Sequence, residues 1–377
     1  MRILIAPDKF KGALNARDVA ENIANGLRDA LPDSEIDIAP MADGGEGTAE
    51  AICEARGGSW LKCKARDPIG REIDARYAWI EDGKLAVMEM SEAAGMRRLS
   101  ESERDPIRAT TFGVGEMILD AASRGANEII IGLGGSATND GGFGMARALG
   151  FRFDYEHEQE KEQEQENEKD GKTVLDLVNL SRIEKPQNLK LPKLTAAVDV
   201  RNPLLGENGA TRVFGPQKGA SKDDLNVLER SLTRLADVLA KEFGVDHRDK
   251  PGAGAAGGLG FGLMSFCDAT IRPGFDVVAD SVGLESKMKD VDLVITGEGS
   301  LDRQTLEGKT PAGVARLARK LGKKVFAIVG RFDGNPQARG LFDGVYQLAR
   351  SDMSESEQMK RAGELLHEKA QELAKAL

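Results

Sequence analysis

The sequence predicts an α/β protein with two α/β domains, a parallel-sheet domain formed by both chain ends and an inserted mixed-sheet domain. Both ends of the chain alternate short apolar strands with helices, which is the pattern of a doubly wound parallel sheet. Between the two ends, residues 59–90 alternate in polarity around turn signals, which is typical of antiparallel strands. We therefore assign residues 1–60 and 275–377 to the first domain and residues 61–274 to the inserted one.

The strands and helices of the first domain are expected at the two ends of the chain. Apolar runs predict the strands, and residues at helical spacing such as Val19, Ile23 and Leu27 predict the helices. The expected strands are Arg2–Ala6, Ile36–Pro40, Asp292–Thr296, Lys324–Val329 and Val345–Leu348. The expected helices are Ala16–Leu31, one that ends near Glu54, Pro311–Leu321 and a polar C-terminal helix.

The inserted domain is expected to begin with the antiparallel strands between Ser59 and Met90. A glycine-rich loop is expected at Pro251–Gly262, because six of the twelve residues in the run PGAGAAGGLGFG are glycine. The other expected elements are strands at Glu128–Leu133 and Leu194–Val200 and helices at Thr111–Ser123, Gly144–Leu149 and Ser221–Phe243.

A strongly charged segment interrupts the inserted domain. Residues 156–172 read EHEQEKEQEQENEKDGK and contain no apolar side chain. Such a segment buries nothing that would offset the entropy lost on ordering, so we expect a disordered, solvated surface loop. The alternative is an acidic tail that binds a partner.

Composition excludes several classes of protein. The net charge of −10 disfavours nucleic-acid binding, and three cysteines without a CxxC spacing disfavour a disulfide scaffold or a zinc site. Three histidines in charged contexts offer little for a catalytic triad or a histidine metal site. No signal peptide and no run of 18 apolar residues is found, so we expect a cytoplasmic enzyme that does not bind membranes.

The strongest motif is the loop GLGGSATNDGG at Gly132–Gly142, which follows an apolar strand and precedes a helical run. Glycines allow backbone N–H groups to approach an anion, hydroxyls add donors, and the helix directs its positive end there. The alternative is a tight turn whose glycines serve packing. The loop has neither the P-loop nor the dinucleotide-binding pattern. The residues we expect to bind phosphate or substrate are Gly134, Gly135, Ser136, Thr138 and Asn139.

Two further loops follow the first and second strands. Asp8, Lys9 and Lys11 stand at the carboxyl end of the first strand, where parallel sheets bind ligands, and they suit a phosphate or carboxylate site. Asp43 and Glu46 lie in the turn DGGEGT, and hard oxygen ligands of this kind suit Mg²⁺. For the first loop, the alternative is that the two lysines are simply solvated. For the second, the alternative is that the acids stabilise the start of the following helix.

Two later loops carry the remaining candidates. Asp199 ends an apolar strand and is a candidate general base, while Arg201 is a candidate clamp for a substrate carboxylate. A structural Asp–Arg pair is the alternative. In the loop TGEGSLDRQT and the GKTP that follows, Glu298 and Lys309 are candidate ligand residues and Asp302 is a candidate metal ligand.

These loops also carry a resemblance to a known family. The blocks APDKFKGALNA, PMADGGEGT, GLGGSATNDGGFG, DVRNPLLGENGATRVFGPQKGA, PGAGAAGGLGFGL and ITGEGSLDRQT resemble, in order, the signature blocks of the glycerate kinase type 1 family. The resemblance implies ATP-dependent phosphorylation of D-glycerate, with 2-phosphoglycerate as the favoured product. It also implies that the end domain is Rossmann- or flavodoxin-like and that the site lies in the cleft between the domains.

The mechanism expected from these residues is direct in-line phosphoryl transfer. Asp199 deprotonates the attacking hydroxyl, and acids such as Asp43 and Glu46 bind Mg²⁺. Lys9, Lys11 and the loop 134–139 stabilise the charge on the phosphates or on the substrate carboxylate. The alternatives are a kinase for another small hydroxy acid and a non-catalytic metabolite-binding protein. The sequence leaves open which hydroxyl is phosphorylated and whether the protein is a monomer or a homodimer.

Overall fold

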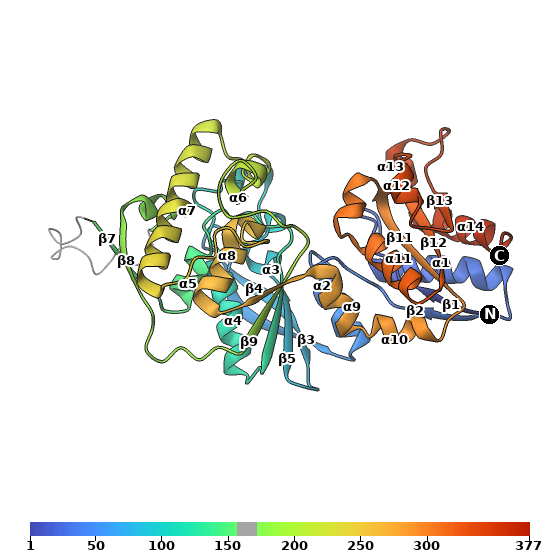
Figure 1. The fold of residues 1–377 in the computed structure, drawn as a ribbon, viewed down its shortest axis with the longest axis horizontal. Helices are drawn as coiled ribbons and strands as arrows, with labels where there is room; N and C mark the ends of the chain where they lie inside the picture. Colours follow the sequence, from blue (N-terminus) through green and yellow to red (C-terminus); the bar gives the residue numbers. More distant parts are fainter. Residues whose placement is uncertain (157–171) are drawn as a thin grey trace. The chain divides into compact units, whose positions relative to one another are not determined.

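The structure is a computed structural model that describes residues 1–156 and 172–377. The disordered loop predicted at residues 156–172 lies outside the described residues except for its two ends. The chain forms two compact units (Figure 1). Unit 1 consists of Met1–Gly57 and Pro273–Leu377, and unit 2 consists of Gly58–Arg272. No described helix has the length and apolar character that crossing a membrane requires.

Unit 1 contains a five-stranded sheet in which neighbouring strands run parallel, as predicted for an α/β protein. Its strands lie in the order β13-β12-β11-β1-β2. Counted along this unit, the order is that of flavodoxin-like sheets, and it reverses between β1 and β11. The strands are β1 (Arg2–Ile5), β2 (Glu35–Ile38), β11 (Leu293–Leu301), β12 (Lys324–Phe332) and β13 (Gly344–Gln347).

The helices of unit 1 cover this sheet. Ile23 and Leu27 of α1 pack with Leu366 of α14 against Ile3 and Ile5 of β1 in one buried cluster. Asn15 caps α1, because its side chain accepts a hydrogen bond from the Asp18 N–H at 2.8 Å. The helices are α1 (Ala16–Ala30), α2 (Thr48–Ala55), α9 (Gly274–Ser281), α10 (Leu284–Lys289), α11 (Thr310–Lys320), α12 (Pro336–Arg339), α13 (Glu355–Lys360) and α14 (Ala362–Ala374).

Unit 2 contains a six-stranded mixed sheet in the order β10-β9-β6-β5-β4-β3. β3, β4 and β5 are antiparallel, which confirms the prediction for residues 59–90, whereas β5, β6 and β9 run parallel. The carboxyl ends of β5, β6 and β9 therefore lie at one edge. The strands are β3 (Ser59–Arg66), β4 (Glu72–Ile80), β5 (Leu85–Glu89), β6 (Glu128–Gly132), β9 (Lys193–Val198) and β10 (Thr270–Pro273), with a separate pair, β7 (Arg152–Tyr155) and β8 (Leu180–Glu184).

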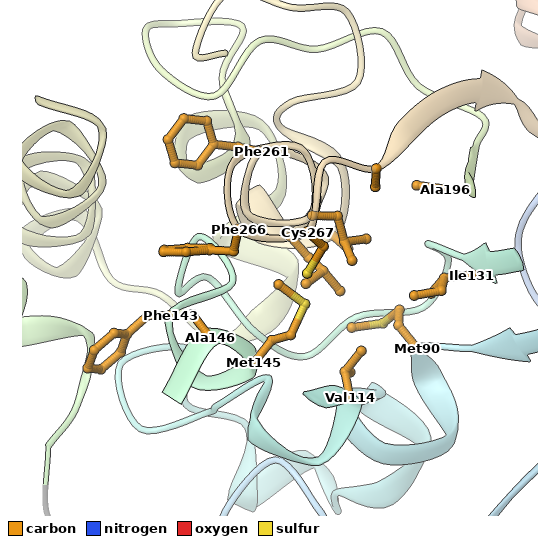
Figure 2. Packing of buried hydrophobic residues seen from close by; sticks show 14 of the residues in the cluster. Met90, Val114, Ile131, Phe143, Met145, Ala146, Ala196, Phe261, Phe266 and Cys267 are labelled. Carbon is orange, nitrogen blue, oxygen red and sulfur yellow. The ribbon is translucent and has the colours of Figure 1, made fainter. Parts of the chain in front are cut away.

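Helices pack on this sheet around one large apolar cluster. Figure 2 shows Met145 of α5 among Cys267 of α8 and Val114 of α4, all three of them buried members of that cluster. All three cysteines of the chain are buried free thiols. The helices of unit 2 are α3 (Ser91–Ala94), α4 (Phe112–Ser123), α5 (Phe143–Ala148), α6 (Ala210–Phe214), α7 (Lys222–Phe243) and α8 (Ala255–Cys267).

The prediction of a loop at Pro251–Gly262 is wrong for most of its length, because α8 begins at Ala255. Every residue of α8 is buried, so burial in the core stabilises a glycine-rich helix that intrinsic propensity disfavours. The helix starts with a left-handed turn in which Ala256, Gly257 and Gly258 have φ angles of 54°, 69° and 88°.

This left-handed turn lies directly against the loop that follows β6. A Cβ atom added to Gly257 would come within 1.9 Å of the Thr138 carbonyl oxygen, and one added to Gly258 within 2.9 Å of the Gly141 Cα. The N–H of Gly141 donates to the Gly257 carbonyl at 3.0 Å. The glycines of α8 therefore allow two backbones to touch, which no larger residue would permit.

Replacing Gly257 by Ala is expected to destabilise the protein more than replacing Gly244, the residue that caps the C-terminus of α7. Both residues have almost the same positive φ, 69° and 68°, but a Cβ on Gly244 would have no described atom within 4 Å. Gly244→Ala should cost about 1–2 kcal/mol of unfolding free energy, the usual penalty for a left-handed alanine. Gly257→Ala should cost at least about 2 kcal/mol more, because backbone atoms must move apart. Urea denaturation measures both, and equal losses would contradict the close approach.

Candidate functional site

Two buried carboxyl groups lie where the strand order of unit 1 reverses. Asp8 follows β1 and Glu298 belongs to β11, and the Asp8 N–H donates to the Gly297 carbonyl at 2.8 Å. The hydroxyl of Thr310 donates to Asp8 Oδ2, and that of Thr305 donates to Glu298 Oε1, both at 2.6 Å. Ligands of parallel sheets bind at such a reversal, so these carboxyls mark the candidate site of unit 1.

The surroundings of these carboxyls favour their protonated forms. Burial, followed by the negative charge of Asp43, raises the pKa of Asp8 to about 7. Burial also raises the pKa of Glu298 to about 7, against the opposing effects of the Thr305 hydrogen bond and the Lys309 charge. Both groups therefore suit either proton exchange near neutral pH or binding to a cation.

Lysines predicted from the sequence stand beside these carboxyl groups. The Lys9 ammonium donates to the Glu46 carbonyl and lies 4.0 Å from Glu46 Oε2. The Lys309 ammonium lies 3.8 Å from Asp302 Oδ1. These are long, partly exposed ion pairs, so they contribute little stability and leave the lysines available to an anionic ligand.

Lys11 is exposed and lies on the same loop as Lys9. The two lysines line a pocket of about 290 Å³, together with Arg17 of α1, Glu46 in the loop before α2 and Glu50 of α2. The structure thus brings the predicted residues Lys9, Lys11 and Glu46 to one pocket within unit 1.

The predicted metal ligands do not form a complete metal cage. Within residues 1–156 and 172–377, no group of three or more His, Cys, Asp or Glu side chains is arranged to hold a metal ion. Asp43 accepts a hydrogen bond from the Gly45 N–H at 3.2 Å, and Asp302 accepts one from the Thr305 N–H at 3.3 Å. Mg²⁺ bound with a nucleotide needs only one or two protein carboxylates, so this arrangement remains compatible with it.

In unit 2 the loop after β6 presents unpaired backbone donors. The N–H groups of Gly134, Gly135 and Ser136 donate to no acceptor among the described residues, whereas the neighbouring Ala137 N–H donates to Ala94 at 2.9 Å. Gly135 has a φ of 71°, the left-handed conformation that lets successive N–H groups converge. This arrangement is suited to binding a phosphate or a carboxylate.

Two other predicted residues of this loop support it from inside. The side chains of Thr138 and Asn139 are fully buried, and the Asn139 amide donates to the Thr211 hydroxyl at 2.9 Å. Their neighbour Asp140 accepts hydrogen bonds from the Thr111 N–H at 2.9 Å and hydroxyl at 2.8 Å. The loop therefore has a buried supporting half and a half whose N–H groups meet no acceptor in residues 1–156 or 172–377.

A buried lysine that sequence reasoning missed reinforces the supporting half. Lys218 is 1% exposed, and its ammonium donates to the Thr138 carbonyl at 2.6 Å. Burial lowers the pKa of Lys218 to about 7, while the nearby Asp140 acts to raise it. In the sequence Lys218 is one lysine among many. Thr305 and Thr310 were missed for the same reason, since only the fold reveals their partners.

Asp199 and Arg201 follow β9, at the same edge of the sheet as the loop after β6. Both residues are exposed. Arg201 forms no ion pair with any residue in 1–156 or 172–377, so the structural Asp199–Arg201 pair considered above does not form. Both side chains thus reach solvent, and Asp199 also interacts with a residue other than Arg201.

The chain is similar over its full length to known proteins. The model of the Glycerate kinase family matches residues 3–377. A glycerate kinase of Halalkalibacterium halodurans is 40% identical over 375 residues, which cover 99% of this chain and 97% of that protein. A glycerate 2-kinase of Escherichia coli K12 is 42% identical over 330 residues, or 88% of this chain and 85% of that protein.

A solved structure is also similar. The crystal structure described as that of a glycerate kinase 2 from Salmonella typhimurium LT2 superimposes with a TM-score of 0.85 at 38% sequence identity. The match covers 100% of this chain and 98% of that one, which confirms the predicted α/β fold class.

Replacing Lys218 by Met is expected to change how stability depends on pH. The pKa of Lys218 is about 7 when folded, below that of an unfolded lysine, so the unfolded state binds more protons between about pH 7 and about pH 10. The free energy of unfolding of the wild type should therefore rise through this range relative to that of Lys218→Met, by roughly 2–3 kcal/mol between about pH 7 and about pH 9.5. Urea denaturation at several pH values measures this.

Lys222→Met is the matched control, because Lys222 is exposed at the start of α7. Its stability should follow that of the wild type at every pH. A wild type and a Lys218→Met variant with parallel pH profiles would show that the buried ammonium is not perturbed.

Proposed function

The chain belongs to the glycerate kinase family, and we propose that it transfers the γ-phosphoryl group of ATP to the 2-hydroxyl of D-glycerate, giving 2-phosphoglycerate and ADP. Family membership makes it an enzyme with kinase activity. The choice of the 2-hydroxyl rests on the similarity to the protein named glycerate 2-kinase. Because ATP is the donor, we place the reaction in the cytoplasm.

Unit 1 supplies the residues that suit a magnesium–nucleotide complex. Bound Mg²⁺ would neutralise charge on the phosphates of ATP. Asp43, Glu46 and Asp302 are the carboxylates that would hold it. This donor set fits Mg²⁺, which prefers carboxylate oxygens. The carboxylates lie close together, since the negative charge of Asp43 contributes to the raised pKa of Asp8. Lys9, Lys11 and Lys309 would balance the remaining phosphate charge.

Unit 2 supplies residues that suit the acceptor. The oxygen of the 2-hydroxyl attacks the γ-phosphorus in line as the bond to the leaving ADP oxygen breaks. Asp199, exposed at the end of β9, accepts the hydroxyl proton as general base. The Gly134–Ser136 N–H groups bind an anionic group, and Arg201 is the residue predicted from the sequence to bind the carboxylate.

Purified protein should release ADP from ATP only when both D-glycerate and Mg²⁺ are present. A coupled ADP assay with and without glycerate, and with the metal removed by EDTA, tests this requirement. The phosphorus NMR signal of the product should couple to the single proton on carbon 2. Coupling to the two protons of carbon 3 would overturn the 2-hydroxyl assignment, and faster turnover of another hydroxy acid in a substrate panel would overturn glycerate as the acceptor.

Asp199→Asn should fold normally and lose at least about 100-fold in kcat, the usual size of a general-base contribution. The amide keeps the shape of the side chain but does not accept the proton. Asp249→Asn, at an exposed aspartate of the same unit, is the control and should keep wild-type kcat. A near-normal kcat for Asp199→Asn would remove Asp199 from the role of base.

A further inference from the structure

Two segments meet beside the unpaired N–H groups of unit 2. β5 and β6 run parallel, with Glu89 opposite Gly132, so the segments that follow them leave the same edge of the sheet. An isolated bridge joins these segments at Gly95 and Ser136. The Met96 N–H donates to the Gly135 carbonyl at 2.9 Å. The segment after β5 is thereby fixed against the glycine loop.

Ser91 brings a buried hydroxyl to this junction. The residue is 3% exposed, and its Oγ has no hydrogen-bond partner among the described residues. A Cβ atom added to Gly135 would stand 3.6 Å from the Cβ of Ser91, so the serine lies next to the glycine loop. A buried hydroxyl without a partner is destabilising, and a ligand oxygen bound at the Gly134–Ser136 N–H groups would supply the missing hydrogen bond.

Arg97 is anchored over the same serine. Its Nε donates to the Ser91 carbonyl at 3.1 Å, and its Nη2 lies 2.6 Å from Glu92 Oε1. These two contacts orient the guanidinium, yet 37% of the side chain remains exposed. An arginine that is already oriented loses little side-chain entropy when it binds an anion.

The charges around Glu92 leave this edge positive. Three guanidinium groups, those of Arg76, Arg97 and Arg98, lie within 3.6 Å of the single Glu92 carboxylate. Even when the buried Glu89 at the end of β5 is counted, the arginines outnumber the acids. In a chain with a net charge of −10, this local excess favours a small anion.

We propose that Arg97 and the Ser91 hydroxyl, together with the N–H groups of Gly134–Ser136, bind the carboxylate of glycerate. The proposal rests on glycerate as the acceptor. A carboxylate has two oxygens, one for the N–H groups and Ser91 and one for the guanidinium. This assigns recognition of the acid to Arg97, for which Arg201 was the sequence-based candidate. Arg201 has no comparable anchoring contact among the described residues.

The test compares D-glycerate with glyceramide, in which a neutral amide replaces the carboxylate. In Arg97→Met, kcat/KM for glycerate should fall at least about 50-fold through a higher KM, while kcat/KM for glyceramide should change less than about threefold. Arg97→Lys should recover only part of the loss, because a lysine lacks the planar fork. A Ser91→Ala variant should raise KM for glycerate by about tenfold without a lower melting temperature.

Arg98→Met is the matched control. Arg98 pairs with the same Glu92, through Nη2 at 3.0 Å, but its Nε donates to the Glu92 carbonyl and not to Ser91. This variant should keep the wild-type preference for glycerate over glyceramide. Circular dichroism melting curves of all variants separate loss of folding from loss of binding.

Three outcomes would overturn the proposal. If Arg97→Met and Ser91→Ala keep the wild-type preference, the carboxylate binds elsewhere. If Arg201→Met alone abolishes the preference, the acid is bound by Arg201. If the wild-type protein releases no ADP with glycerate, the proposed function fails together with this inference, whereas the first two outcomes leave that function intact.

Discussion

The contact between the start of α8 and the loop after β6 is the constraint on which unit 2 depends. Gly257 brings its backbone so close to Thr138 that a Cβ atom would stand 1.9 Å from a carbonyl oxygen. This contact requires a left-handed turn inside a fully buried helix. With one side of the loop held by α8 and by Lys218, the N–H groups of Gly134–Ser136 have no acceptor in the part of the chain that the structure describes. A rigid loop with free donors can bind an anion without first being reorganised.

Buried ionisable groups give both units their chemical character. Lys218 supports the glycine loop, and Asp8 and Glu298 lie at the strand-order reversal of unit 1. Burial moves the pKa of each of these groups to about 7. Such groups lower stability, and proteins retain them mainly where charge must bind or move. The polar partners that fix them, Thr305 and Thr310 among them, belong to the site as much as the charged groups do.

The fold was largely predictable because its signals are local. Apolar runs and helical spacing indicated the parallel strands of unit 1 and the antiparallel strands of residues 59–90. The error at Pro251–Gly262 arose because glycine is a poor helix former, and only burial against Gly141 and Thr138 makes a helix stable there. Of the predicted site residues, Asp8 and Lys9 stand in the loop after β1, as loop position predicted. Glu298 was expected in a loop but lies within β11, because that strand continues to Leu301. Thr138 and Asn139 face the interior.

By itself the sequence determined the α/β class, most strands of the two large sheets and the family, because each depends on local patterns or on ordered blocks of residues. Only the tertiary structure decided which polar side chains are buried and what each contacts. Lys218 beneath Thr138, Thr310 on Asp8 and Arg97 over Ser91 join residues from different loops. Such contacts depend on how strands and helices pack, and the residues adjacent in the sequence do not indicate that packing.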